Sequence, residues 1–316
     1  MIQQDCPGIV IPSAVEPGDS IAIVSPAGIV KEEFIDGAAA YLSACGFHPV
    51  VMPSAKGPAE GSYSATLRAR LSDLRLAIKN PQIKAILCSR GGYGCIHLLP
   101  HLSPQLIAAN PKWLIGFSDV SALHALWLHS GVASIHGPMA KHLSTAGADD
   151  PYSAALVEML RNTGRFDISV SAHQFNRDGN AAGELRGGNL AVLNSLADTP
   201  YDIFRFDDGE DIVLFLEDIG ERIYEVERMI TRLILSGAIY RLRGLVIGQF
   251  TEYGPDRNFD TMEQMIDSLL RKAGLRDIPV AFNFPTGHVD DNYPLTEGRR
   301  VSLEVRDAYT RLRTIG

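Results

Sequence analysis

Short apolar runs alternate with amphipathic segments through the first half of the chain. The runs at residues 20–28, 47–55, 83–89 and 112–116 predict buried strands. Segments 32–46 and 65–80 predict helices, the second because Leu67, Leu71, Leu74 and Ile78 recur at the helical period. Further helices are expected after residues 90–94 and after Gly116. This alternation predicts a mostly parallel sheet covered on both faces, with ligands bound beyond the carboxyl ends of its strands.

The pattern changes after a helix that we expect to begin with Asp150 as N-cap and Pro151 at its first position. Residues 163–183 are polar, glycine-rich and weakly patterned, and the part beyond them mixes strands at 211–218, 243–250 and 299–305 with two helices. Those helices carry apolar stripes that predict core-facing sides: Ile223, Val226, Ile230 and Leu233 in one, Met262, Met265, Ile266 and Leu269 in the other. We therefore predict an N-terminal α/β domain over residues 1–165, a linker over 166–182 and a smaller mixed α/β domain over 183–316.

Composition restricts the class of protein. The 316 residues are 46% hydrophobic and 21% charged, which is typical of a soluble globular protein with a sizeable core. The net charge of −8 argues against a nucleic-acid or anionic-membrane partner, since either needs a basic face. No stretch resembles a signal peptide or a membrane span. The four cysteines, Cys6, Cys45, Cys88 and Cys95, form no paired motif, so we expect reduced thiols and a cytoplasmic location.

Ser118 is the first candidate for chemistry. It follows an apolar strand and Gly116 and precedes a helix, which places its hydroxyl at the mouth of the sheet beside the free N–H groups of a helix start. The arrangement is that of a nucleophile elbow, although the residues do not match G-x-S-x-G. From this segment alone, a simple helix cap explains the serine at least as well.

A nucleophilic serine needs a base, and the base needs an acid to orient it. Of the nine histidines, two lie where a base is useful. His136 ends a predicted strand, and His288 lies on a loop held by prolines and glycine. Glu217 and Asp218 close an apolar strand, where a carboxylate needs a partner if it is buried. A strand-end charge that reaches water is the other interpretation of Glu217.

A glycine-rich loop, RGGYG, follows the strand that ends near residue 89. Adjacent glycines there let backbone N–H groups approach a ligand, either a phosphate or an oxyanion. A tight turn is the simpler explanation of the same residues. The sequence contains no H-E-x-x-H motif and no Cys/His cluster, so no metal site is expected.

Taken together, these segments resemble the LD-carboxypeptidase family of serine peptidases. The resemblance is carried in the first half by PGDSIAIVSPAG (17–28), SRGGYG (89–94), NPKWLIGFSDVSALH (110–124) and SIHGP (134–138). In the second half it is carried by GELRGGNLAVL (183–193), FLEDIGERIYEVERMITRL (215–233), GLVIGQF (244–250) and PTGHVDDNYPLTEG (285–298). The order and spacing of these segments extend through nearly the whole chain.

The resemblance implies a flavodoxin-like N-terminal domain and a Ser–Glu–His triad. Matched motif by motif, the nucleophile is Ser118, the acid is Glu217 and the base is His288. It also implies an oxyanion hole made by the backbone N–H groups of Gly92 and Asp119. The capping interpretation of Ser118 then becomes the weaker one.

The activity that the resemblance implies is hydrolysis of the amide between an L-centre and a terminal D-amino acid. The substrate expected is a small peptide, the murein tetrapeptide of cell-wall recycling, from which D-alanine is released. Arg90 is our candidate for binding the terminal carboxylate, with a structural ion pair as its other interpretation. The resemblance implies no cofactor, and it suggests a homodimer.

Two other functions remain open at this point. The same family includes hydrolases of peptidyl- or aminoacyl-adenylate antibiotics, which need a side chain that stacks on a nucleobase. Both tryptophans, Trp113 and Trp127, flank the Ser118 corner, and residues 183–201 hold no long insertion, which favours the carboxypeptidase, although a Tyr or Phe side chain can also stack. A non-catalytic module that holds a phosphate or sugar on RGGYG predicts no reactivity at Ser118. One departure from the family pattern, Ala197 to Pro200 in place of a Gly-Thr-Pro turn, concerns a loop and not the triad.

Overall fold

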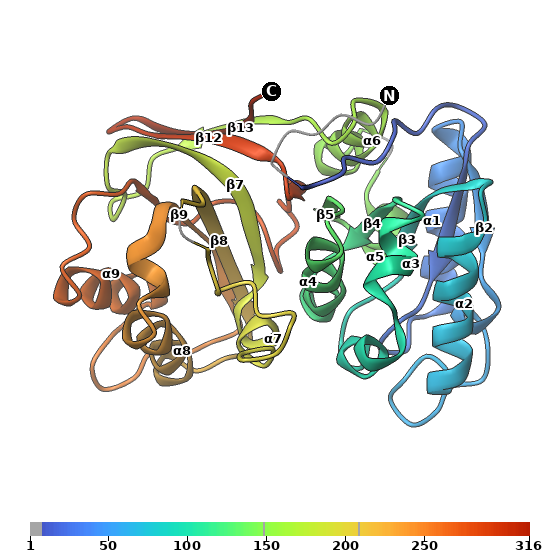
Figure 1. The fold of residues 1–316 in the computed structure, drawn as a ribbon, viewed down its shortest axis with the longest axis horizontal. Helices are drawn as coiled ribbons and strands as arrows, with labels where there is room; N and C mark the ends of the chain where they lie inside the picture. The colour runs from blue at the N-terminus through green and yellow to red at the C-terminus, as the bar shows by residue number, and fades with distance from the viewer. Residues whose placement is uncertain (1–7, 148, 208) are drawn as a thin grey trace. The chain divides into compact units, whose positions relative to one another are not determined.

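A computed structural model describes residues 8–147, 149–207 and 209–316 of the chain (Figure 1). The chain forms two compact units. The first comprises the chain up to Arg165 together with Asn292–Gly298, and the second comprises Phe166–Asp291 and Arg299–Gly316. The second unit is therefore discontinuous in sequence, because residues 292–298 between its two segments belong to the first unit.

The first unit is built on a six-stranded sheet with the order β11-β5-β4-β3-β1-β2. The strands are β1 (Ser20–Val24), β2 (His48–Val51), β3 (Ile83–Cys88), β4 (Trp113–Gly116), β5 (Ser134–His136) and β11 (Leu295–Glu297). β1 to β5 are parallel and follow the order of the flavodoxin fold, while β11 pairs antiparallel with β5. The predicted fold class of this part is confirmed. The carboxyl ends of its parallel strands meet at one edge, where loops after β1, β3 and β4 lie together.

The helices of the first unit divide into two groups by their contacts. The α-helices are α1 (Glu32–Ala44), α2 (Leu67–Lys79), α3 (Pro104–Ala108), α4 (Ser121–His129), α5 (Ala140–Thr145) and α6 (Pro151–Arg161), and the 3₁₀ turns are η1 (Pro53–Ala55), η2 (Cys95–His101) and η3 (Ser118–Val120). α1 packs on α5, whereas α2, α3, α4 and η2 contact one another. Right-handed crossovers place these two groups on opposite faces of the sheet. The predicted cap of α6 is confirmed, because the Asp150 side chain accepts a hydrogen bond from the Ser153 N–H.

The second unit is built on a mixed seven-stranded sheet with the order β10-β9-β8-β7-β12-β13-β6. The strands are β6 (Asp167–Ser171), β7 (Gly179–Asn189), β8 (Ile212–Ile219), β9 (Leu242–Thr251), β10 (Val280–Ala281), β12 (Arg300–Val305) and β13 (Tyr309–Thr314). β7 to β10 are parallel to one another, and β12, β13 and β6 continue the sheet from β7 in antiparallel pairs. The mixed α/β class predicted for this part is also confirmed.

The helices of this unit are α7 (Leu190–Asn194), α8 (Ile223–Leu235) and α9 (Met262–Lys272), with the 3₁₀ turn η4 at Ala238–Arg241. α8 and α9 pack side by side (Figure 1). Both apolar stripes predicted for them are buried, which accounts for the helical period of their sequences. Among the described residues no helix is long and apolar enough to cross a membrane.

Several local expectations need correction. The segment after the glycine-rich loop forms the 3₁₀ turn η2 and not an α-helix, and it contains Pro100. The weakly patterned stretch 163–183 contains β6 and the first part of β7. β6 is an edge strand whose alternate residues are exposed, which explains its polar sequence. Cys45, Cys88 and Cys95 are free thiols as expected, whereas Cys6 lies outside the described residues.

One glycine in the second sheet tests this packing. Gly187 on β7 pairs with Phe215 on β8, and a Cβ at this position would lie 2.0 Å from the Phe215 carbonyl oxygen. Because the obstacle is backbone, Gly187→Ala forces the two strands apart and should cost about 3 kcal/mol or more of stability. Thermal unfolding of purified protein measures it. The control is Gly254→Ala, where nothing lies within 4 Å of the added Cβ. Equal melting temperatures for the two variants would contradict the close approach of β7 and β8.

Candidate active site

Ser118 occupies an unusual backbone conformation at the end of β4. Its φ is +64°, in the left-handed region that residues with a side chain rarely adopt. The N-cap positions of η3 and α4 are Phe117 and Val120, and neither helix start has a side-chain cap hydrogen bond. The capping interpretation of Ser118 is therefore wrong. Ser118 is instead a half-buried serine in a turn with a strained, left-handed backbone. This backbone conformation is typical of a nucleophile elbow.

The glycine-rich loop after β3 lies directly against this turn. A Cβ on Gly91 would lie 2.8 Å from the Ser118 Cβ and 3.0 Å from its Oγ, so only glycine fits there. The Gly91 carbonyl accepts a hydrogen bond from the Gly28 N–H at 3.0 Å, which adds the loop after β1 to the same cluster. Gly92 follows in the left-handed region with φ +101°. The motif RGGYG was singled out in the sequence, but the contact of Gly91 with Ser118 was not.

Two buried charged side chains fix these loops. Arg70 on α2 donates from Nη1 to the carbonyls of Pro26 (2.6 Å) and Gly94 (3.1 Å), and from Nε to that of Ala65 (3.1 Å). The Asp119 carboxylate accepts the Cys95 N–H at 2.8 Å, which ties the turn after Ser118 to the start of η2. Burial raises the pKa of Asp119, and the hydrogen bond from the Cys95 N–H opposes that rise. Arg70 was missed, because one arginine in an amphipathic helix carries no sequence signal.

Arg90 and Tyr93 lie on the outer part of this loop. Arg90 is exposed and donates a hydrogen bond to the Ile29 carbonyl at 2.5 Å. The Tyr93 ring is 56% exposed and stands edge-on to the His97 ring at a centroid distance of 5.1 Å. Both side chains are therefore accessible to a ligand at the carboxyl edge of the sheet.

The two histidines of the first unit near Ser118 are buried in its core. His124 on α4 has its Nε2 2.8 Å from the Gly116 carbonyl and its Nδ1 2.8 Å from the Ser134 hydroxyl. Burial lowers the pKa of His124 to about 4, so it is neutral at physiological pH. His136, the rival base, is 0% exposed on β5 and packs 5.8 Å from the Phe117 ring. A fully buried imidazole of this kind does not face a substrate.

Glu217 and His288 form a hydrogen-bonded pair in the second unit. The Glu217 Oε2 accepts from the His288 Nδ1 at 2.7 Å, and the carboxylate is fully buried while the imidazole is 14% exposed. Glu217 lies at a bulge, since Leu216 pairs with Ile247 of β9 but Asp218 pairs with Phe250. The other carboxylate oxygen, Oε1, is buried without a hydrogen-bond partner among the described residues. The bond to His288 is thus the main stabilisation of this charge.

Glycines make room for the pair. A Cβ on Gly287, whose φ is +116°, would lie 2.7 Å from the Glu217 Oε2. A Cβ on Gly248 would lie 2.9 Å from the Thr286 carbonyl and 3.2 Å from the Glu217 Cβ. The loop that carries His288 approaches β8 only because both positions lack a side chain.

Asp218, the neighbour of Glu217, has a different role. Its carboxylate accepts hydrogen bonds from the Asn189 side chain (2.9 Å) and from the N–H groups of Ala191 (2.8 Å) and Ile219 (2.9 Å). Burial, helped by the charge of Glu217, raises the pKa of Asp218 to about 7 against the effect of these hydrogen bonds. The residues alone left both acids open and the resemblance implied Glu217, whose carboxylate is hydrogen-bonded to the His288 imidazole.

The pKa of His288 reflects this acidic environment. Burial alone would lower the pKa of the imidazole. The hydrogen bond and charge of Glu217, aided by the charges of Asp218 and Glu252, outweigh burial and raise it above the usual value of 6.5. The pair therefore stabilises the protonated imidazole, which is the state that a histidine base reaches when it accepts a proton. No group of three or more metal-binding side chains occurs among the residues that the structure describes.

Comparison with known proteins decides the family. The model of the LD-carboxypeptidase N-terminal domain matches residues 21–137, and that of the LD-carboxypeptidase C-terminal domain matches residues 182–303. This chain belongs to the LD-carboxypeptidase family. The membership confirms the resemblance found in the sequence motifs.

Individual relatives of this LD-carboxypeptidase family member cover most of its length. The murein tetrapeptide carboxypeptidase of Pseudomonas aeruginosa is 32% identical over 76% of this chain and 79% of its own. The microcin C7 self-immunity protein MccF of Escherichia coli is 24% identical over 96% of this chain and 95% of its own. The crystal structure of muramoyltetrapeptide carboxypeptidase from Oxalobacter formigenes has a TM-score of 0.82 at 28% identity, and covers 94% of this chain and 99% of that chain.

The pKa of His288 can be measured by a pH titration of the imidazole carbon resonances in NMR spectra. The wild type should titrate above 6.5, because the negative charge of Glu217 stabilises the imidazolium. In Glu217→Gln the pKa should fall below 6.5, since burial then dominates. Glu252→Gln should produce a smaller decrease, and Glu227→Gln on α8 should leave the pKa unchanged. A wild-type pKa below 6.5 would contradict the environment described for His288.

Proposed function

We propose that this protein is a serine carboxypeptidase that cleaves the amide between an L-centre and a terminal D-amino acid, and that it releases D-alanine from murein tetrapeptides. The observation that carries the proposal is the buried hydrogen bond between Glu217 and His288, an acid–base pair set to take up a proton. Support comes from the family and from the murein tetrapeptide carboxypeptidase among the relatives.

In the proposed mechanism Ser118, Glu217 and His288 act as a triad. The Ser118 hydroxyl attacks the scissile carbonyl while the His288 Nε2 takes its proton. Glu217 keeps the Nδ1–H tautomer in place and stabilises the imidazolium. His288 then protonates the departing amine of the D-amino acid, and a water molecule, deprotonated by the same imidazole, releases the acyl group from Ser118.

The proposed oxyanion hole uses backbone N–H groups of Gly92 and Asp119. Support comes from the close approach of Gly91 to Ser118 and to the Asp119 nitrogen, and from the ties that hold both loops. Such a donor is worth about 3–4 kcal/mol in the transition state. We assign Arg90, exposed on the same loop, to the terminal carboxylate of the substrate.

Hydrolysis of an aminoacyl-adenylate antibiotic is the second candidate, since MccF is among the relatives. An enzyme of that kind needs a side chain that stacks on a nucleobase. Trp113 is 0% exposed and Trp127 is 1% exposed, and both indole N–H groups donate to main-chain carbonyls. Neither tryptophan is therefore available for stacking, which supports the carboxypeptidase, whereas the exposed Tyr93 ring is available and keeps the second candidate open to test.

Release of free D-alanine from a murein tetrapeptide tests the reaction and the nucleophile together. Ser118→Ala should lower the rate by at least about 10³-fold, because no other group replaces the attacking hydroxyl. Ser62→Ala, an exposed serine of the same unit, should retain wild-type activity. Release that survives in Ser118→Ala would exclude Ser118 as the nucleophile. If the wild type releases nothing, hydrolysis of an aminoacyl adenylate under the same conditions tests the second candidate.

The dependence of kcat/KM on pH tests the base. The base must be neutral to accept a proton, and the pKa of His288 lies above 6.5, so the rate should rise with pH through that raised value. Glu252→Gln should move this acidic limb to lower pH by the same amount as the pKa of His288 in the NMR titration. An acidic limb that does not follow the titration would show that another group is the base.

A further inference from the structure

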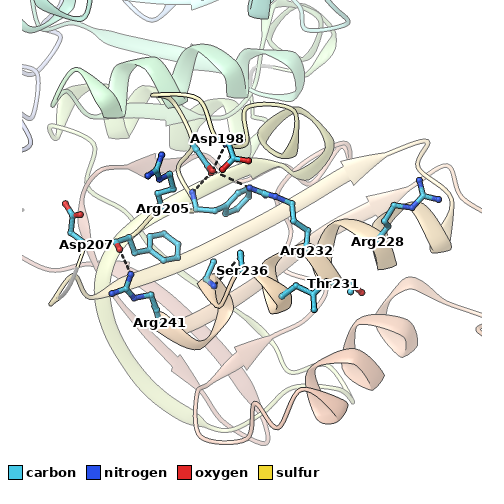
Figure 2. A pocket seen from close by; sticks show the side chains of 13 residues that line it. Asp198, Arg205, Asp207, Arg228, Thr231, Arg232, Ser236 and Arg241 are labelled. Carbon is cyan, nitrogen blue, oxygen red and sulfur yellow. Dashed lines mark hydrogen bonds and ion pairs between the residues drawn. The ribbon is translucent and has the colours of Figure 1, made fainter.

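The second unit holds a cavity of about 830 Å³ whose walls carry four arginines (Figure 2). The loop 198–207, the C-terminal half of α8 and η4 form its walls. The arginines come from all three segments and are Arg205, Arg228, Arg232 and Arg241. Three aspartates, Asp198, Asp202 and Asp207, also line the cavity.

Two of the arginines have structural roles. Arg232 forms an ion pair with Asp202 at 3.3 Å and lies over the Phe204 ring at 5.5 Å. Asp202 also accepts hydrogen bonds from the N–H groups of Asp198 and Phe204 at 3.0 Å each, so this carboxylate is already engaged. Arg241 donates from Nη1 to the Phe206 carbonyl at 2.5 Å.

Arg205 and Arg228 are different. Both are exposed, and within residues 8–147, 149–207 and 209–316 neither guanidinium has a hydrogen bond or an ion pair. Arg228 only lies near the Tyr224 ring, at 5.6 Å. Figure 2 shows the two side chains on opposite sides of the cavity, Arg205 on the loop and Arg228 on α8. The cavity therefore has an available cation at each side.

The end of helix α8 does not account for this concentration of positive charge. The carbonyls at a helix C-terminus favour a cation only within the last turn, and Arg232 meets that need. Arg228 lies a turn earlier, and Arg205 and Arg241 belong to other segments. Arg205 and Arg228 are therefore the two guanidiniums that stay available to an anion, on walls that also carry the carboxylates of Asp198 and Asp207.

This cavity is separate from the Glu217–His288 pair. Arg241 precedes Leu242, which pairs with Ile212 at the start of β8, whereas Glu217 lies near the end of that strand. The five residue steps from Ile212 to Glu217 span about 16 Å at ~3.3 Å per residue. A ligand in the cavity therefore approaches the opposite end of the sheet from the candidate active site.

We propose that the cavity binds a small polyanion with two phosphate groups, one at Arg205 and one at Arg228. The planar guanidinium matches phosphate oxygens in a two-pronged geometry, and the Thr231 and Ser236 side chains add hydroxyl groups to the wall. The volume of about 830 Å³ lies within the range of small-molecule sites. A ligand with two phosphate groups offers one of them to each of these guanidiniums.

Isothermal titration calorimetry with pyrophosphate, at constant ionic strength, tests the site. The wild type should bind saturably, and the double variant Arg205→Ala/Arg228→Ala should bind at least 10-fold more weakly, because both free guanidiniums are lost. Arg257→Ala, which removes an exposed arginine of the same unit outside the cavity, should bind as the wild type does. Melting temperatures without ligand confirm that each variant is folded.

Two further titrants decide the class of ligand. Orthophosphate should bind at least 10-fold more weakly than pyrophosphate, and citrate should not compete with it. The proposal is overturned if the wild type does not bind pyrophosphate, if the double variant binds as tightly, or if orthophosphate or citrate binds equally well. The readout is binding without turnover, so its outcome is independent of the proposed carboxypeptidase activity.

Discussion

The close approach of Gly91 to Ser118 is the constraint on which the loops at the carboxyl edge of the first unit's sheet depend. A left-handed conformation at a serine costs about 1–3 kcal/mol and persists only where the surroundings enforce it. Here the surroundings are the glycine-rich loop, which has no side chain at the point of contact. A Cβ on Gly91 would lie only 2.8 Å from the Ser118 Cβ. The buried side chains of Arg70 and Asp119 fix the glycine-rich loop and the turn at Ser118 through hydrogen bonds to main-chain groups. The turn and the N–H groups beside it are thus fixed before any ligand arrives, which is what electrostatic preorganisation requires.

In the second unit a buried charge has the corresponding role. A carboxylate out of water is costly unless it is paired, and the Glu217 Oε2 has the His288 imidazole as its partner. The bulge in β8 and the glycines at positions 248 and 287 bring the two side chains together. Removal from water makes the charge of an unpaired Glu217 unfavourable. It also strengthens the electrostatic attraction between the Glu217 carboxylate and a protonated imidazole. Burial and pairing therefore oppose each other at His288, and the net rise of its pKa shows that pairing is the larger effect.

The sequence predicted the parts of this protein that repeat a local pattern. Apolar strand runs, amphipathic stripes and the Asp150 cap could be predicted because each depends on neighbours a few residues away. The motifs around Ser118, Glu217 and His288 were recognised as a family resemblance, which already implied Glu217 and not Asp218 as the acid, and the structure adds the hydrogen bond between Glu217 and His288. The role of Arg70 could not be predicted, because the main-chain carbonyls that accept its hydrogen bonds lie 5, 24 and 44 residues away in the sequence. The position of β11 was not predicted either, because this strand lies in the second half of the sequence but pairs with β5 of the first half.

The two ends of β8 lie near different sets of charged side chains. Acidic groups surround His288 at the carboxyl end of β8, whereas four arginines and three aspartates line the cavity near its start. Direct electrostatic influence across about 16 Å is weak, since the Debye length at physiological salt is about 8 Å. An anion in the cavity therefore does not change the pKa of His288 appreciably through solvent. Communication between the two ends has to pass through packed structure, and α8 is a candidate element because it begins four residues after β8 ends and lines the cavity with its last turns.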